Sequence, residues 1–204
     1  MLDNKSLENF IFNISSSEEG RMILEKIQIY KEMLIDENSR INLISKRTLD
    51  DINNRHLLDS VQLMPIINSK QMSLLDVGTG AGLPGIMLAI AGCKNVNLVE
   101  KQGKKCEFLK KVNNKLELKM NILNSRVEDI AGQNFNFIIA RAFAKIDQII
   151  SLTKKISNKN TKYILLKGKT FLDEIQLINI SKFNIKYFDS ITSAESKIIE
   201  LSYK

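Results

Sequence analysis

The sequence has no tryptophan and very little histidine, cysteine or proline: one, two and two residues respectively in a chain of 204. The cysteines, Cys93 and Cys106, are too few for a disulfide framework. A single histidine, His56, excludes the usual histidine and cysteine zinc sites, so we expect no metal. No apolar run approaches the roughly 20 residues that span a bilayer, and residues 1–5 lack the basic start and apolar core of a signal peptide. These absences predict a cytoplasmic protein that does not enter a membrane.

Acidic residues are also fewer than basic ones. Thirty Lys and Arg against 23 Asp and Glu give a formal net charge of +7. Such an excess favours a polyanionic partner, since basic side chains that contact phosphates release counterions, although it also serves solubility alone. Lysines are dense between residues 101 and 119, where they form either an RNA-facing strip or a plain solvated helix face. The hydrophobic fraction of 44% is enough for a folded core.

The first 70 residues carry helical patterns only. Apolar residues recur every three or four positions over residues 18–35, which predicts an amphipathic helix capped by Ser17. A second helix is predicted over residues 56–67. We therefore predict a helical amino-terminal cap over residues 1–70, followed by a second domain over residues 71–204.

From residue 72 onward, short apolar runs alternate with helix-period segments. The predicted strands cover residues 72–77, 96–99, 120–123, 135–140 and 163–166, and the predicted helices cover residues 83–91, 104–118 and 146–156. This alternation indicates a parallel sheet with helices on both faces. Residues 185–190 and 197–201 have no helix between them and predict an antiparallel hairpin. The expected fold is therefore α/β, with a Rossmann-like, seven-stranded and mostly parallel sheet.

A glycine-rich loop follows the first predicted strand. Gly78, Gly80 and Gly82 let the backbone turn sharply and approach a ligand closely. Glu100 lies 20 residues after Gly80, at the end of the second strand, from which a carboxylate can reach a ribose. The run Gly80–Gly85 also fits the dinucleotide pattern G-x-G-x-x-G, so the loop alone leaves a nicotinamide or flavin cofactor open.

Asp76 favours a different cofactor. It ends the first strand at the mouth of the loop, where a dinucleotide would place its pyrophosphate and a carboxylate would repel it. S-adenosylmethionine carries an ammonium and a sulfonium instead of phosphates, which a carboxylate can attract. We therefore expect an S-adenosylmethionine-dependent methyltransferase.

The later loops bear on the methyl acceptor. Methylation at C5 of a pyrimidine needs a nucleophilic cysteine, and neither cysteine follows one of the later strands. Amino methylation of adenine or cytosine typically uses an Asp/Asn-Pro-Pro-aromatic loop after the fourth strand, where this chain reads Ala140-Arg141-Ala142-Phe143. An acceptor that is already nucleophilic, such as guanine N7, needs mainly positioning. Arg141 could orient a guanine, or form only a structural salt bridge.

Several motifs together resemble one family. They are Asn42-Leu43, Arg55-His56-Leu57-Leu58-Asp59-Ser60, the loop Asp76–Gly85 with its Leu83-Pro84-Gly85 end, Ser125-Arg126-Val127-Glu128, Arg141-Ala142-Phe143 and Leu166-Lys167-Gly168. In this order and spacing, over about residues 42–169, they resemble the ribosomal RNA small subunit methyltransferase G family. Two positions depart from the family pattern. Ala81 stands where proline is frequent, and Ser196-Lys197 where an arginine is frequent, which leaves one RNA contact in doubt.

The resemblance implies methyl transfer from S-adenosylmethionine to N7 of a guanine in the 530 loop of bacterial 16S rRNA, in the small ribosomal subunit. It places Gly78, Leu83, Val127, Glu128 and Arg141 at the donor, with Arg141 also bordering the acceptor as the catalytic residue. We add Asp76, Gly80, Gly82 and Glu100 as donor-binding candidates. RNA contacts are expected from Arg55, His56, Arg126 and Lys167, although His56 could equally be a packing residue.

Two other functions remain open on the residues alone. A methyltransferase of small molecules or proteins would have a closed and mostly apolar acceptor pocket. A non-catalytic RNA-binding protein with a degenerate fold would bind no methyl donor. We expect a monomer.

Overall fold

The amino-terminal part of the chain is helical, as predicted, but begins earlier than expected. The computed structural model describes residues 4–67 and 69–204, so residues 1–3, part of the segment considered for a signal peptide, lie outside the described residues. The cap contains α1 (Asn4–Ile14), α2 (Ser17–Asn38), a 3-10 helix (Lys46–Asp51), a π-helical segment (Asn53–Leu58) and α3 (Asp59–Val61). Helix α1 was not predicted. Among the described residues, no helix is both long and apolar enough to cross a membrane.

Two predicted details of the cap are wrong. Ser16, not Ser17, caps α2, because the Ser16 side chain accepts a hydrogen bond from the Glu19 amide at 3.3 Å and Ser17 is already helical. The helix predicted over residues 56–67 is instead a π-helical segment running into the short α3, followed by turns. π-helical turns are frequent at functional sites, and this segment contributes Arg55 and His56 to the site described below.

The rest of the chain forms a seven-stranded sheet, as expected. Its strands are β1 (Ser73–Val77), β2 (Asn95–Glu100), β3 (Asn121–Asn124), β4 (Phe137–Arg141), β5 (Lys162–Lys167), β6 (Phe183–Asp189) and β7 (Lys197–Tyr203). Their order is β3-β2-β1-β4-β5-β7-β6; β7 pairs antiparallel with β5 and β6, and the other pairs are parallel. The predicted hairpin is thereby confirmed.

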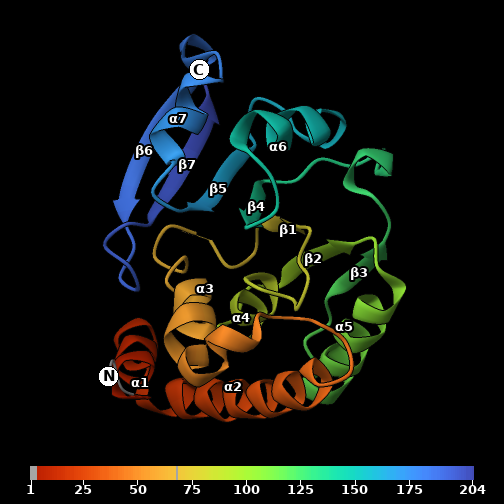
Figure 1. Cartoon of the computed structure of the whole chain (residues 1–204), viewed down its shortest axis with the longest axis vertical. Coiled ribbons are helices and arrows are strands. Elements are labelled where there is room, and N and C mark those ends of the chain that lie inside the picture. The colour runs from red at the N-terminus through yellow and green to blue at the C-terminus, as the bar shows by residue number, and fades with distance from the viewer. Residues whose placement is uncertain (1–3, 68) are drawn as a thin grey trace.

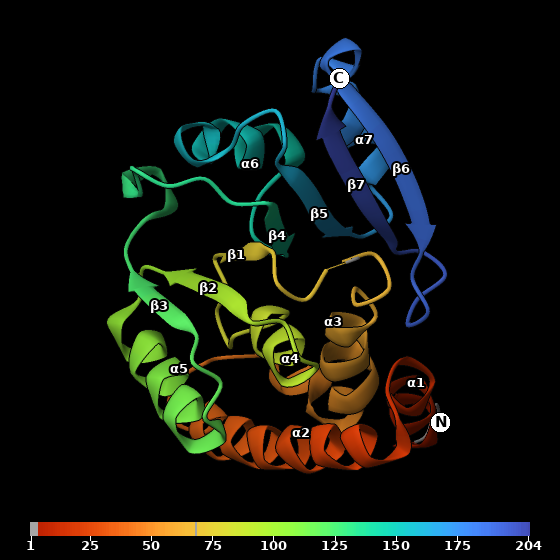
Figure 2. The same cartoon turned by 180° about the vertical axis from the view of Figure 1, so that it is seen from behind.

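Helices cover both faces of the sheet (Figure 1). They are α4 (Gly85–Ile90), α5 (Gly103–Leu116), α6 (Ile146–Leu152) and α7 (Phe171–Gln176), with shorter 3-10 helices at Val127–Asp129, Lys154–Ile156 and Ile180–Lys182. Helix α7 was not predicted. The cap, α4 and α5 lie on one face and α6 and α7 on the other, as the view from behind also shows (Figure 2).

Alternate strand residues divide into two apolar clusters because successive side chains point to opposite faces. Leu74 packs with the cap and α4, whereas its neighbour Leu75 packs with α6 and α7. Each fully buried side chain of this size contributes roughly 1.5–3 kcal/mol of transfer free energy. The first cluster runs without a break from α1 and α2 to the sheet, so the cap and the sheet share one core.

The strand order reverses between β1 and β4, which are neighbours in the sheet. In open α/β sheets, ligands bind at such a reversal, in the crevice outside the carboxyl ends of the strands. The glycine loop follows β1, and the segment Arg141–Phe143 ends β4 and follows it. The topology therefore brings together the two segments that the sequence singled out.

Candidate active site

Asp76 holds the glycine loop from beneath. Its carboxylate is fully buried, and Oδ2 accepts hydrogen bonds from Thr79 Oγ1 at 2.6 Å and from the Gly85 amide at 2.8 Å. Burial raises the pKa of Asp76 to about 6, against the opposing effect of these hydrogen bonds. Oδ1 is buried without a hydrogen-bond partner among the described residues. Asp76 thus ties the Thr79 and Gly85 ends of the loop together through one carboxylate oxygen.

Tyr30 anchors the same loop from the cap. This fully buried side chain of α2 donates a hydrogen bond from its hydroxyl to the Ala81 carbonyl at 2.9 Å. Burial raises the pKa of Tyr30 well above its usual value, so the hydroxyl stays protonated and remains a donor. Tyr30 lies within the amphipathic helix predicted over residues 18–35, and its hydroxyl makes it part of the framework of the site.

Glu100 faces the loop from β2. Its Oε2 accepts from the Gly80 amide at 3.1 Å, and its Oε1 accepts from the Gln102 amide at 2.8 Å. Because a carboxylate oxygen has two lone pairs, each oxygen keeps room for one further donor. Glu100 is therefore fixed by backbone amides while each of its oxygens can still accept from a further donor.

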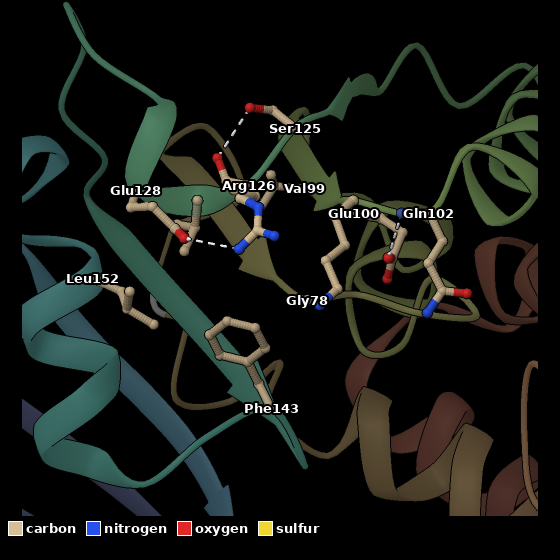
Figure 3. Close-up of a pocket in the computed structure, with 11 residues that line it drawn as sticks. Gly78, Val99, Glu100, Gln102, Ser125, Arg126, Glu128, Phe143 and Leu152 are labelled. Carbon is tan, nitrogen blue, oxygen red and sulfur yellow. Dashed lines mark hydrogen bonds and ion pairs between the residues drawn. The ribbon is translucent and has the colours of Figure 1, made fainter.

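A cavity of about 360 Å³ lies beside Glu100 (Figure 3). Apolar side chains of Val99, Val127, Leu152 and Phe143 form part of its wall, and Gly78, Glu100, Lys101, Gln102, Ser125, Arg126 and Glu128 complete it. This lining fits a nucleoside, with apolar walls for a flat base and a carboxylate for the sugar. We name it the donor cavity.

Not every residue that was predicted to bind the methyl donor lines this cavity. Gly78, Glu100, Val127 and Glu128 line it, as does Arg126, which was expected at the RNA. Leu83 is buried in the core beneath the loop, and Asp76, Gly80 and Gly82 act through the loop's shape rather than as cavity wall. Gly82 has a positive φ, and a Cβ there would meet Ile86 at 2.2 Å.

Arg141 is held by the π-helical segment of the cap and by α3. Its Nη1 donates to the Arg55 carbonyl at 3.1 Å and to Asp59 Oδ2 at 3.2 Å, and its Nη2 lies 3.1 Å from His56 Nδ1. The side chain is only 16% exposed. The salt bridge to Asp59 and the contacts with Arg55 and His56 therefore fix the guanidinium at the carboxyl end of β4.

His56 is neutral in this cluster. Burial, with the positive charges of Arg141 and Arg55, lowers the pKa of His56 to about 4. Since Arg141 can only donate, Nδ1 accepts, and the Nε2 hydrogen is directed to Thr48 Oγ1 at 2.7 Å. His56 thus works as a fixed acceptor for Arg141, a role the sequence could not distinguish from packing.

The depressed pKa makes stability depend on pH. An unfolded histidine binds its proton near pH 6.5, roughly, whereas His56 in the folded protein binds it only near pH 4. Between these values the unfolded state holds more protons, so folding stability falls as pH falls from 6.5 towards 4. We expect this loss, measured by urea unfolding, to be smaller in His56→Gln than in the wild type. Parallel pH profiles for the two proteins would contradict the assignment.

A second cavity, of about 460 Å³, lies next to the first. Phe143 lines both cavities, and Arg141 lines the second one together with Asp59, Ala142, Ala144, Lys145, Leu166, Lys167, Gly168, Glu174 and Ser196. We name it the acceptor cavity, after the role proposed for it below. Its lining contains three cationic and two acidic side chains. It therefore differs from the closed and mostly apolar pocket expected for a small-molecule methyltransferase.

Besides His56, the three residues expected at RNA lie in different settings. Arg55 and Arg126 are well exposed, and each is paired only loosely, at 3.6 Å, with Asp51 and Glu128 respectively. Lys167 is 9% exposed; its Nζ donates to the Ala144 carbonyl at 2.5 Å and to Glu174 Oε2 at 2.8 Å. The structure therefore leaves Lys167 less available to a phosphate than the sequence suggested. The lysine-rich helix is α5, which packs on α2 and β3 at the edge of the sheet.

Comparison with known proteins matches this chain to one family. Residues 23–196 match the family described as rRNA small subunit methyltransferase G. The ribosomal RNA small subunit methyltransferase G of Rickettsia akari is 40% identical over 186 residues, which are 91% of this chain and 96% of that protein. The protein of that name from Rickettsia bellii is 40% identical over 181 residues, covering 88% and 93% of the two chains. The chain belongs to this family.

The fold agrees with this membership. Magnesium protoporphyrin IX methyltransferase from Synechocystis, solved with bound S-adenosylmethionine, superposes with a TM-score of 0.62 at 17% identity, over 86% of this chain and 97% of that one. Ribosomal protein L11 methylase from Lactobacillus delbrueckii gives 0.59 at 18% identity, over 72% and 77%. The protein is thus an S-adenosylmethionine-dependent methyltransferase of the rRNA small subunit methyltransferase G family, as the resemblance implied.

Proposed function

We propose that this methyltransferase transfers a methyl group from S-adenosylmethionine to N7 of a guanine in the 530 loop of 16S rRNA. The observation that carries the proposal is the fixed guanidinium of Arg141, which lines the acceptor cavity, while Phe143 lines both this cavity and the donor cavity. A guanidinium pairs well with the oxygen edge of guanine.

The chain's residues have distinct parts in this proposal. S-adenosylmethionine, when bound, supplies an electrophilic methyl group on a positively charged sulfur. Glu100 accepts from its ribose, and Val99, Val127 and Leu152 form the apolar wall for its adenine. Arg141 orients the acceptor base, while Asp59 and His56 keep the guanidinium from moving.

Such a transfer depends on the positioning of the two reactants more than on a general acid or a general base. The N7 lone pair of guanine forms the new bond to the methyl carbon, the carbon–sulfur bond breaks, and its electron pair goes to sulfur. No proton leaves the acceptor, so the reaction does not require a general base, and holding the two reactants in line can supply most of the acceleration. Exposed Arg55 and Arg126 are then available for phosphate contacts of the RNA.

The direct test is a map of N7-methylated guanines in 16S rRNA from cells with and without the gene. We expect one guanine of the 530 loop to lose its methylation without the gene and to regain it on complementation. Unchanged methylation there would contradict the proposal. Calorimetry with S-adenosylmethionine separates the enzyme from a non-catalytic RNA-binding protein, which would show no binding heat.

A further inference from the structure

Glu174 is an acidic side chain in the acceptor cavity that the sequence did not single out. It lies on α7, and its side chain is 15% exposed. Oε2 accepts from the Ile146 amide at 3.0 Å and from Lys167 Nζ at 2.8 Å. Oε1 accepts no hydrogen bond from the described part of the chain. The carboxylate is thus fixed through one oxygen and open through the other.

The cavity holds complementary groups for one base. Arg141, which can only donate, keeps N–H groups beyond those given to Arg55, Asp59 and His56. Glu174, which only accepts when ionised, lines the same cavity. Guanine presents an acceptor, O6, beside two donors, the N1 and N2 hydrogens. Adenine presents a donor at N6 and an acceptor at N1, which this pair would repel.

We infer that Glu174 determines base specificity: its Oε1 accepts the N1 and N2 hydrogens of the target guanine while Arg141 donates to O6. The inference rests on the proposed function and names the residue that reads the base.

Inosine provides a test that needs no variant. It keeps N7, O6 and the N1 hydrogen of guanosine but lacks the 2-amino group. Small subunits are reconstituted with ligated 16S rRNA that carries guanosine or inosine at the methylated position. We expect wild-type kcat/KM to be roughly tenfold to a hundredfold higher for guanosine, the usual effect of a hydrogen bond to a charged group. Equal rates for the two RNAs would overturn the inference.

Glu174→Gln then assigns the preference to this side chain. The amide has one oxygen, which the Ile146 amide and Lys167 require, so its NH2 group would face the donor edge of guanine. We expect kcat/KM for the guanosine RNA to fall. The ratio of kcat/KM for the guanosine RNA to that for the inosine RNA should approach one. Asp173→Asn removes the same charge from an exposed neighbouring position of α7 and should keep the wild-type preference.

The outcomes separate the possible roles. If Glu174→Gln lowers both rates and keeps the preference, Glu174 only supports Lys167 and α6, and the inference is overturned. If wild-type enzyme methylates neither RNA although it binds S-adenosylmethionine, the proposed function itself fails, and the inference with it. A preference that disappears only in Glu174→Gln supports both.

Discussion

Arg141→Ala is expected to lower the kcat/KM of methyl transfer by about a hundredfold to a thousandfold, the usual effect of removing one fixed donor at a reacting group. The guanidinium is the part of the site that three neighbours hold in place, Asp59, His56 and the Arg55 carbonyl. Without it the acceptor base loses its orientation, while Asp59 keeps its contacts with Gln62 and Thr192. The free energy of unfolding should therefore change by only about 1–2 kcal/mol.

Arg141→Lys tests the geometry of this prediction. A lysine keeps the positive charge but is a point donor, so it cannot contact His56 and Asp59 as a planar fork does. We expect it to recover little of the lost rate. Arg40→Ala, at an exposed ion pair at the end of α2, is the matched control and should leave rate and stability unchanged. Rates are measured by transfer of labelled methyl groups, and stability by urea unfolding. Equal losses of rate and stability in Arg141→Ala would indicate a purely structural salt bridge.

The fold could be predicted where the sequence has strong periods. Each predicted strand overlaps an observed one, and central strands that are buried on both faces produce apolar runs such as residues 163–166. Two helices escaped prediction: α1, which has eleven residues, and α7, whose six residues are too few for a helical period to show. The cap of α2 was misplaced by one residue because Ser16 and Ser17 are chemically equivalent candidates.

The site could be predicted only in part, for a different reason. Gly78 and Glu100 lie 22 residues apart within one β-α-β unit, so their motif is local in sequence. The hydrogen bonds that hold Arg141 join residues more than 80 positions apart, and Asp59 also accepts a hydrogen bond from Thr192, 133 positions away. Tertiary packing alone brings such groups together. Glu174 shows the same limit, because its partner Ile146 lies on another helix.

Gly78→Ala is expected to weaken S-adenosylmethionine binding by a hundredfold or more, roughly the 3 kcal/mol by which overpacking destabilises a close contact. Gly78 has a φ of +63°, and an added Cβ would lie 2.1 Å from the ring of Phe143. Both residues line the donor cavity, as Figure 3 shows, so the methyl group and the displaced ring would occupy space needed by the ligand. Calorimetric titration with S-adenosylmethionine measures the effect.

Two further variants separate the steric effect from backbone strain. Gly132→Ala imposes a similar backbone strain, because Gly132 has a φ of +79°, but an added Cβ there meets nothing within 4 Å. Backbone strain should destabilise folding by about 1–2 kcal/mol in both variants, with the overpacking against Phe143 added in Gly78→Ala, whereas only Gly78→Ala should lose the donor. Phe143→Leu in the Gly78→Ala background should restore part of the binding, because a smaller side chain can make room for the new methyl group. If Gly132→Ala weakens donor binding as much as Gly78→Ala does, then general destabilisation, not contact at the donor cavity, explains the loss.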